Sequence, residues 1–251
     1  MPEPTASPPN DAGDEAGVLA PAPATVPEPE PRQRWRAVFG RTADAAALAH
    51  REVAEALEDA LAESPLPLMR DRKRGDRPRV TFGAPLPIGM VVDRELFDLW
   101  LTALRPLNEI RAVVGGALAP GYELHDLYDI WLGALALPAS VVGATYRVTL
   151  EAGIDRAALA AAIEGLLEAA SLPRQRVKGS GTVAYDLRPL LADLALLDGD
   201  RPSLQIDVRF DPTRGSGRPE EVVAALAEAL DRPLEVTETR RTQLVVEDSA
   251  G

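Results

Sequence analysis

The chain has 251 residues, of which 46% are hydrophobic, 26% are charged and only 4% are aromatic. This composition is typical of a globular protein that packs its core mainly with Leu, Val and Ala. Because the chain has no cysteine and only two histidines, disulfides, cysteine nucleophiles and cysteine-ligated iron–sulfur or zinc sites are excluded. We therefore expect no metal and no cofactor. Since no uninterrupted apolar run of about 18 residues occurs, we also expect no membrane span and no membrane partner.

The formal charge of −12 is unevenly distributed. Residues 1–31 contain six acids, nine prolines and no lysine or arginine. Such a segment cannot bury enough apolar surface to offset the entropy cost of ordering, so we predict a disordered acidic tail. It also lacks the basic start and apolar run of a secretory signal, which favours a cytoplasmic location.

The first half of the remaining chain predicts alternating strands and helices. Apolar residues such as Trp35 and Phe39 recur at every second position where a strand is expected and at helical spacing elsewhere. Thr42 and Asp44 offer cap oxygens for the first helix. We predict strands over residues 34–40, 78–83, 95–101 and 122–127, and helices over residues 45–63 and 108–118.

The second half repeats this order. Asp155 can cap one helix, and Pro219 suits the first turn of another. We predict strands over residues 144–150, 176–186, 203–210, 234–238 and 242–246, and helices over residues 156–170, 187–197 and 220–230. The repeated rhythm predicts an α+β fold with two tandem ferredoxin-like (β-α-β-β-α-β) units, spanning residues 32–140 and 141–247.

The strongest local charge feature is the segment 70–79, in which six bases accompany two acids: Arg70, Arg72, Lys73, Arg74, Arg77 and Arg79. Arginine pairs bidentately with phosphate oxygens, so a loop of this kind can bind phosphate groups. The alternative is a solvated connector, because charge runs commonly serve only to keep loops in water.

A second basic set consists of Arg174, Arg176 and Lys178. If the two units are pseudo-symmetric, both sets could line one groove and contact RNA. The scarcity of aromatic residues favours contact with the nucleic-acid backbone over base readout. The loop 214–219 precedes a predicted helix and could bind an anion through its amides, or simply be a flexible connection.

Four short segments resemble the radical-SAM-linked protein family, DUF2344. They are Arg79–Gly89 (RVTFGAPLPIG), Tyr185–Leu190 (YDLRPL), Arg218–Val222 (RPEEV) and Arg240–Thr242 (RRT). The resemblance implies a bacterial protein encoded beside, or fused to, a radical SAM enzyme, in some lineages with a ribonuclease E/G neighbour. The family's own molecular activity is unassigned.

The chain departs from the family pattern in two places. In the first predicted helix the family carries F-L-S-H-L-D. In residues 46–52 here His50 is retained, but Ala49 stands in place of the Ser and Arg51 or Glu52 in place of the Asp. The family's loop with an aromatic residue and an Asn is here the arginine-rich segment 71–79. Chemistry that depends on those Ser, Asp or Asn residues is therefore not expected in this chain.

Five further residues are candidates for a site. Asp186 and Arg188 lie two apart and predict either a structural ion pair or an arginine clamp for a phosphate or carboxylate. His50 is either a helix-surface residue or a base. Arg218 and Arg241 belong to the motif segments and are added to the predicted anion-binding set.

These features give a leading hypothesis and two alternatives. The first is a non-catalytic accessory protein that associates with a separate radical SAM enzyme and presents RNA or another anionic substrate. The second is a cleft enzyme acting on RNA nucleotides through His50, Asp186 and Arg188, which requires the three side chains to converge. The third is a structural scaffold between two enzymes.

Overall fold

The structure, a computed structural model, describes residues 30–179 and 181–247. The prediction of a disordered tail falls almost entirely on residues 1–29, which lie outside the described residues. In chain order the elements are β1 (Gln33–Arg41), α1 (His50–Ala62), β2 (Arg70–Asp71), a 3-10 turn (Arg72–Arg74), β3 (Arg77–Pro78), β4 (Val80–Phe82), β5 (Val91–Leu101), α2 (Leu107–Ala117), β6 (Tyr122–Ile130), α3 (Leu137–Ser140), β7 (Val141–Leu150), α4 (Arg156–Glu168), β8 (Pro173–Lys178), β9 (Gly181–Asp186), a second 3-10 turn (Arg188–Leu190), β10 (Leu191–Leu197), β11 (Ser203–Asp211), β12 (Gly215–Ser216), α5 (Pro219–Ala229) and β13 (Val236–Val246).

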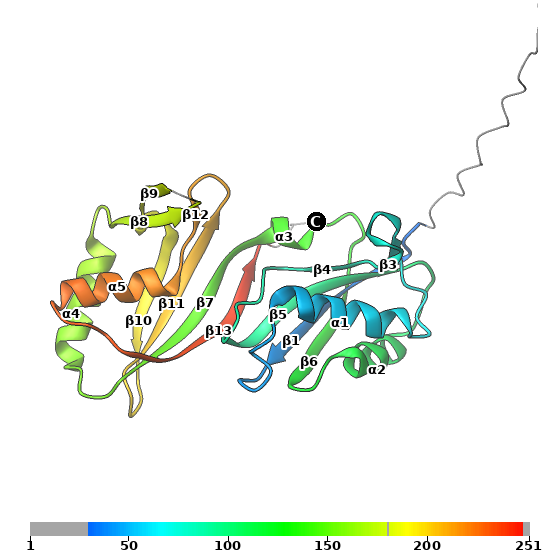
Figure 1. Cartoon of the computed structure of the whole chain (residues 1–251), viewed down its shortest axis with the longest axis horizontal. Helices are drawn as coiled ribbons and strands as arrows, with labels where there is room; N and C mark the ends of the chain where they lie inside the picture. Colours follow the sequence, from blue (N-terminus) through cyan, green and yellow to red (C-terminus); the bar gives the residue numbers. More distant parts are fainter. Residues whose placement is uncertain (1–29, 180, 248–251) are drawn as a thin grey trace, which may run out of the picture.

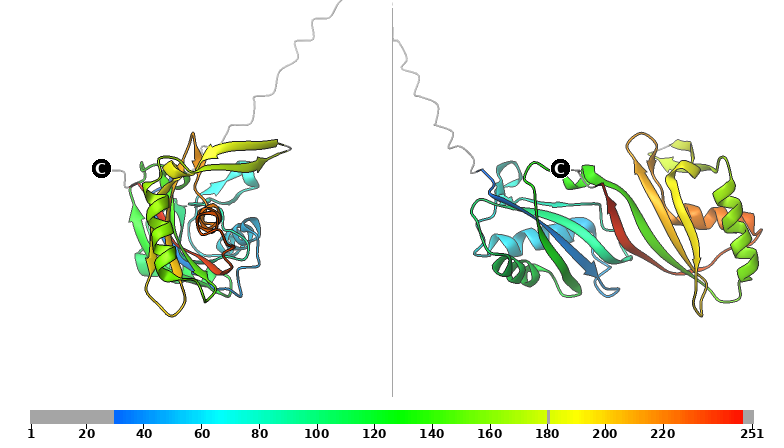
Figure 2. Two further views of the ribbon diagram at one scale, coloured as in Figure 1. Left: turned by 90° about the vertical axis from the view of Figure 1, so that its left-hand side faces the viewer. Right: turned by 180° about the vertical axis from the view of Figure 1, so that it is seen from behind.

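The fold is mixed α+β, with a central sheet to which both halves of the chain contribute. Its strand order is β10-β11-β7-β13-β5-β1-β6, with β4 added on β5 and β12 added on β11 (Figure 1). All pairs are antiparallel except β13 with β5. Two short hairpins, β2–β3 and β8–β9, stand apart from this sheet (Figure 2).

Two separate hydrophobic clusters pack against the sheet. The first-half cluster draws only on residues 35–127 and includes Phe39 and Phe97 of the sheet, Val53 of α1 and Ile110 of α2. The second-half cluster is built mainly from residues 137–244 and includes Leu159, Ile206 and Leu226. Because each half has its own core, the elements that cross between them determine how the halves are joined.

Strand β13 makes that connection. It pairs antiparallel with β7 over most of its length, and parallel with β5 where Arg240 and Arg241 face Val91 and Val92. Three register shifts along its pairing with β7 allow it to bend from one neighbour to the other. The prediction of two extended segments, 234–238 and 242–246, is thus corrected to one continuous, bulged strand.

A buried ion pair holds this crossing together. The Nε of Arg241 donates to the carboxylate of Glu95 on β5, and the two residues are only 3% and 1% exposed. Burial raises the pKa of the Glu95 carboxyl, while the positive charges of Arg241 and Arg41 act in the opposite direction. Arg241 also donates to the backbone carbonyl of Pro85 at 3.1 Å, which attaches the loop between β4 and β5 to the same point.

Most predicted elements are confirmed, but one strand and two helices need correction. The strand predicted over residues 176–186 is two strands, β8 and β9, which pair antiparallel with each other as a hairpin. Residues 191–197 form strand β10 rather than a helix, because their pairing with β11 overrides the helix-favouring leucines. Helix α1 begins at His50 instead of residue 45. Tertiary bonds hold the preceding segment, with Ala46 O accepting from Gly89 N at 2.8 Å, so Thr42 and Asp44 do not cap the helix.

We expect Glu95→Ala to destabilise the protein by about 3–5 kcal/mol, because it leaves the Arg241 guanidinium buried without its counter-charge. The matched control is Glu238→Ala, which removes the exposed partner of Arg240 and should cost no more than about 1 kcal/mol. Urea unfolding measures both variants. Equal destabilisation by the two substitutions would contradict the central role of the buried pair.

Candidate anion-binding site

The basic segment 70–79 forms the β2–β3 hairpin, and its charges are largely neutralised by α1. Arg74 lies 2.9 Å and Arg77 lies 3.2 Å from the buried carboxylate of Glu58. Arg77 also pairs with Asp59 at 3.0 Å. Paired in this way, the two arginines fasten the hairpin to the helix and offer less charge to a ligand than the sequence suggested.

The outer residues of this hairpin also have intramolecular partners. Arg70 donates to the carbonyls of Asp76 and Ala62, and the Arg79 guanidinium stacks 4.3 Å from the centroid of the Trp100 ring. Arg72 and Lys73 lie in the exposed 3-10 turn between the two strands. The structure therefore favours the connector interpretation for much of this segment.

The second half contains a different arrangement, a surface cavity of about 710 Å³ that we call the arginine cavity. It lies between the β8–β9 hairpin, the 188–190 turn and the turn that joins β11 to β12. Its lining comprises four arginines, one aspartate and six other residues: Arg176, Arg188, Arg209, Arg214, Asp186, Ala170, Val183, Ala184, Tyr185, Pro189 and Thr213. The lining has a formal charge of +3 on a protein of charge −12.

Two of the four cavity arginines are held by neutral groups. Arg188 donates to the carbonyl of Leu167 at 2.7 Å and to that of Leu191 at 3.1 Å. Arg209 donates to the carbonyls of Pro189 and Leu191, both at 3.3 Å. Because carbonyls orient a guanidinium without cancelling its charge, these side chains retain the ability to attract an anion.

The third cavity arginine, Arg176, stacks on an aromatic ring. Its guanidinium lies 5.3 Å from the centroid of Tyr185, and it passes directly over Gly215, where a Cβ would come within 2.9 Å of Nη1. Gly215 has φ +99°, so the turn needs glycine both for its backbone and for this close approach.

Asp186 shapes the cavity wall but forms no ion pair with Arg188 among the described contacts. Its carboxylate accepts from the backbone N–H of Leu172 at 2.7 Å and of Arg188 at 3.0 Å, which lowers its pKa. The predicted structural ion pair is therefore corrected: the carboxylate fixes the backbone turn, while the guanidinium is bound elsewhere. The positive charge of Arg188 is therefore not neutralised by Asp186, as it would be in an ion pair.

The fourth cavity arginine, Arg214, lies in a turn that Asp211 stabilises. Its carboxylate accepts from the Thr213 hydroxyl and from the backbone N–H groups of Thr213 and Arg214, at 2.7–2.9 Å. These bonds lower its pKa from 3.8 to about 2. Of the loop 214–219, the structure places Arg214 in the lining of the arginine cavity.

The other predicted anion-binding residues have varied surroundings. Arg174 pairs with Glu228 at 2.9 Å, whereas Arg218 is exposed at the start of α5 and its charge acts on Tyr185 together with those of Arg174 and Arg176. Lys178 lies in β8, but its side chain is outside the described part. Arg241 is corrected to a structural residue, because it is buried against Glu95.

The proposed catalytic side chains do not share a pocket. Asp186 and Arg188 line the arginine cavity, whereas His50 is the first residue of α1 and packs edge-to-face on Phe82 at 5.0 Å. Burial, aided by the charges of Arg241 and Arg41, lowers the pKa of His50. No hydrogen-bond partner of its Nδ1 occurs within the described residues. His50 therefore belongs to the junction between the halves.

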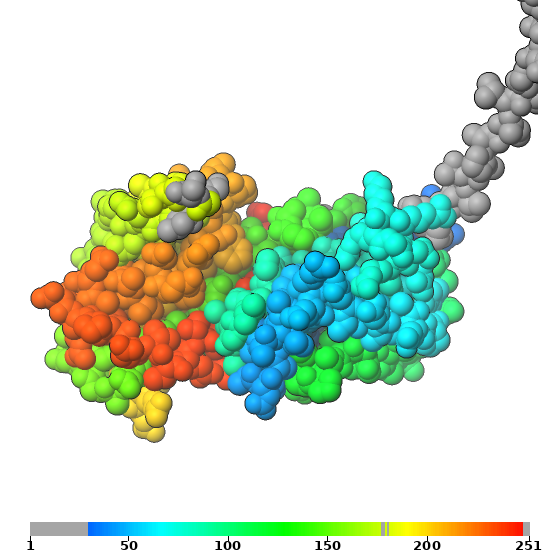
Figure 3. Space-filling view, viewed as in Figure 1, coloured from blue at the N-terminus to red at the C-terminus, as the bar shows by residue number. Residues whose placement is uncertain are grey.

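The two basic sets also do not form one cavity. The β2–β3 and β8–β9 hairpins lie near the same edge of the molecule but at opposite ends of its long axis (Figures 1 and 3). Sequence reasoning did not identify Arg209, Tyr185 or the Asp211 turn as parts of a site. The sequence signal that could have identified Arg209 is a charged residue at an exposed position of the alternating strand β11.

Within residues 30–179 and 181–247, no helix is long and apolar enough to cross a bilayer. In the same part of the chain, no cluster of three or more His, Asp or Glu residues is arranged to hold a metal ion.

The protein is of the mixed α+β class, with a single central sheet. Residues 34–219 match the model of a family described as an uncharacterized protein conserved in bacteria (DUF2344), and the chain belongs to this family. No curated protein matches the chain.

Three solved structures show partial similarity to this chain. They are a Cbf5–Nop10–Gar1 complex (10% identity, TM-score 0.47), the archaeal box H/ACA sRNP Nop10–Cbf5 complex (11%, 0.43) and an H/ACA RNP bound to a substrate RNA containing 2′-deoxyuridine (10%, 0.46). The matches cover 83%, 84% and 82% of this chain, but only 48%, 49% and 47% of the matched chains. The chain thus spans about half the length of these neighbours.

We expect the Asp211 carboxyl to titrate with a midpoint near pH 2 in a side-chain NMR titration. A folded-state pKa below the unfolded value means that this group stabilises the turn above pH 3.8, and that the contribution is lost as the pH falls toward about 2. Asp211→Ala should accelerate amide exchange at Thr213 and Arg214, and Asp200→Ala should not. A midpoint near 4 would show that the turn is open.

Proposed function

We propose that the chain consists of two tandem ferredoxin-like units, residues 32–140 and 141–247. The support is topological. The first half has the strand order β4-β5-β1-β6 and the second has β10-β11-β7-β13, and neighbours within each set are antiparallel. In both halves the first strand is internal and lies beside the fourth, and a helix follows the first and third strands, as the ferredoxin-like arrangement requires.

We propose that this protein is a cytoplasmic, non-catalytic accessory protein that binds RNA or a related phosphate-rich ligand in the arginine cavity. One observation carries the proposal: Arg188 and Arg209 are oriented by backbone carbonyls, and Arg176 by an aromatic ring, instead of by carboxylates. Their charge is therefore uncompensated and preorganised, which is the arrangement that favours binding of a polyanion.

The chemistry of the lining favours a nucleic-acid ligand over a small inorganic anion. Planar guanidinium groups match phosphate oxygens, and the Tyr185 ring with Arg176 above it provides a surface on which a base can stack. The single acid in the lining, Asp186, already accepts two backbone amides. Since Tyr185 is the only aromatic residue in the lining, we expect contact mainly with the phosphate backbone.

We further propose that the accessory role is exerted on a separately encoded radical SAM enzyme. The support is the resemblance of four segments to the radical-SAM-linked family, three of which lie at two places in the structure. Asp186 and Arg188 of the YDLRPL segment line the arginine cavity, and the RVTFGAPLPIG segment supplies the Pro85 carbonyl that Arg241 binds. Because this chain has no cysteine, any cysteine-ligated cluster must belong to the partner.

The RNA proposal is tested by replacing Arg176, Arg209 and Arg214 together with glutamine. We expect weaker binding of single-stranded RNA, measured by fluorescence anisotropy across a salt series. The slope of log K against log salt should fall by about 2, at roughly 0.7 for each phosphate that is no longer neutralised. The matched control replaces Arg51, Arg105 and Arg111, which pair with acids elsewhere, and should leave the slope unchanged.

A second variant separates the arginine cavity from the β2–β3 hairpin. Replacing Arg72, Lys73, Arg74 and Arg77 should weaken binding less than the cavity variant does, because Arg74 and Arg77 are paired with Glu58. Wild-type affinity of the cavity variant at low salt would refute the cavity as the RNA site, and circular dichroism establishes that each variant is folded.

The partner proposal is tested by co-expression with the radical SAM protein encoded in the same genomic neighbourhood, followed by size-exclusion chromatography. We expect a single complex that persists after nuclease treatment, because docking of two proteins does not require RNA. Separate elution of the two proteins at micromolar concentration would refute it. Loss of the complex only after nuclease treatment would show that RNA, and not a protein interface, links them.

A further inference from the structure

A second exposed feature lies at the opposite half of the molecule, where β6 ends. Four large apolar side chains are exposed there: Tyr128 (41%), Trp131 (73%), Leu132 (41%) and Leu135 (53%). We call them the Trp131 surface. Single exposed apolar residues are ordinary, but a contiguous group that includes a tryptophan is characteristic of a binding surface.

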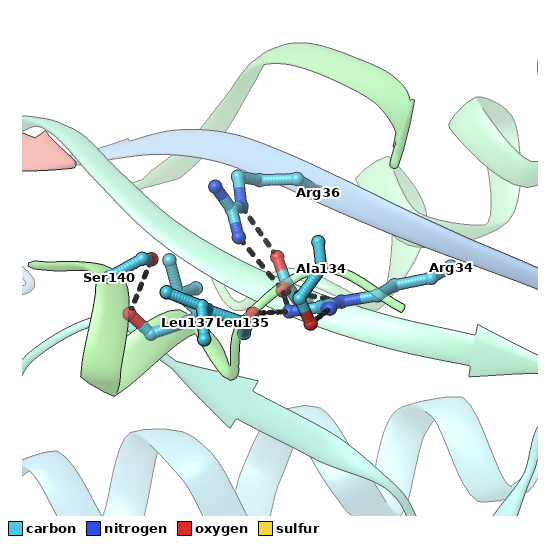
Figure 4. Close-up of polar contacts among 7 residues, drawn as sticks. Arg34, Arg36, Ala134, Leu135, Leu137 and Ser140 are labelled. Atoms are coloured by element: carbon cyan, nitrogen blue, oxygen red, sulfur yellow. Dashed lines mark hydrogen bonds and ion pairs between the residues drawn. The ribbon is translucent and has the colours of Figure 1, made fainter. Parts of the chain in front are cut away.

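The segment that carries this surface is held rigidly from below. Arg34, which is 2% exposed, donates to the carbonyls of Ala134 and Leu135, both at 2.7 Å, and at the same time to the fully buried carboxylate of Asp98 (Figure 4). Arg36 donates to the same carboxylate. Through Arg34, this buried charge network binds the backbone carbonyls of Ala134 and Leu135. It thereby fixes the loop after β6, whose apolar side chains are exposed to solvent.

The Trp131 indole is positioned as well. A Cβ on Gly133 would lie 2.6 Å from Cζ2 of the indole, so the ring lies close against Gly133 and only glycine leaves room for it there. Next to it is a cavity of about 360 Å³, lined in part by Tyr128, Trp131, Leu135 and Val246. This volume suits insertion of an apolar side chain from a partner.

Charges around the surface restrict what can dock on it. The exposed charged residues of β6 and of the cavity rim are all acidic: Glu123, Asp126, Asp129 and Glu247. Of the arginines nearby, Arg34 and Arg36 are buried beneath and bound to Asp98. Arg111 of α2 pairs with Asp126 at 3.1 Å, so the charge of this one rim acid is already compensated. Strand β6 is also an edge of the sheet, with a pairing partner on one side only within the described residues. An unpaired edge can accept one more strand.

This charge pattern excludes three occupants. RNA is a polyanion and would be repelled, so this surface is distinct from the arginine cavity. Residues 1–31 of the same chain carry six acids and no base, and are excluded for the same reason. A second copy joined edge to edge through β6 would bring Glu123, Asp126 and Asp129 close to the same acids of its partner.

We propose that the Trp131 surface, together with the free edge of β6, docks a basic, apolar extended segment of a partner protein. The segment adds a strand to β6, places an apolar side chain in the 360 Å³ cavity beside Trp131, and pairs its lysines or arginines with the rim acids. Backbone pairing and the anchor residue supply affinity, while the charges select a basic partner over an acidic one.

The test uses a labelled synthetic peptide that alternates lysine with leucine and valine over roughly the length of β6. We expect saturable binding in fluorescence anisotropy, accompanied by a change in tryptophan emission, since Trp35 and Trp100 are 6% and 5% exposed and Trp131 is 73% exposed. Trp131→Ala should weaken binding about tenfold or more, as loss of an interface anchor does. Asp129→Lys should weaken it through charge alone.

Gly133→Ala provides a variant that moves the indole without removing it, and should also weaken binding. The control is Ile88→Ala, which removes an equally exposed apolar side chain (69%) elsewhere in the same half and should have no effect. RNA affinity should stay unchanged in Trp131→Ala, so failure of this proposal is distinguishable from failure of the RNA site.

Four results would overturn the proposal. These are no peptide binding at about 1 mM, the weak end of specific affinity; equal binding of a peptide with glutamate in place of lysine; competition by single-stranded RNA; and a dimer of the unmodified protein that Trp131→Ala dissociates.

Discussion

The buried Arg241–Glu95 contact is the constraint on which the arrangement of the two halves depends. Each half has its own hydrophobic cluster, with Val38 and Leu96 as buried first-half residues that join the second, and the backbone pairing between β13 and β5 involves only two facing positions. Pairing at only two positions does not by itself determine the angle between β13 and β5. The charge pair adds a directional bond at the crossing, and the Pro85 carbonyl adds a second, so that strand and loop are oriented together. Since each charge is buried and would lose its main partner if the contact broke, the two strands are held at this contact.

The surface arginines divide into groups by what neutralises them. On the β2–β3 hairpin, Glu58 accepts Arg74 and Arg77, and the result is a fastened loop. In the arginine cavity, the partners of Arg188, Arg209 and Arg176 are carbonyls and an aromatic ring instead of carboxylates, so their positive charge is not neutralised. The same residue type thus stabilises a loop in one place and, in our proposal, binds a ligand in another. A count of basic residues along the sequence cannot separate the two.

Local sequence patterns predicted those elements of the fold whose conformation depends only on neighbouring residues. Alternation identified β1, β7 and β11, and caps and spacing identified α4 and α5, because these signals act within a few residues. Sequence reasoning was wrong for residues 191–197, where a leucine-rich segment suits both helix and strand and a distant neighbour, β11, decides. It also placed the start of α1 too early, because the bond between Ala46 and Gly89 spans the first half.

The candidate site was less predictable than the fold. Asp186 and Arg188 were identified as residues of interest, but their actual roles depend on Leu172, Leu167 and Leu191, which no short motif reveals. Arg209 comes from β11, and its contribution requires knowledge of how β11 lies beside the 188–190 turn. The group in the arginine cavity is assembled from three separate segments, and only tertiary packing brings them together.

The position of β13 in chain order has a consequence for biosynthesis. This strand follows every other one along the chain, yet it lies in the middle of the central sheet. Residues 35–127, which make up the first-half cluster, leave the ribosome well before it and can collapse as a unit. Until β13 has been synthesised, the edges of β7 and β5 that pair with it stay unpaired. A chaperone that shields nascent chains would therefore bind these edges before β13 is complete.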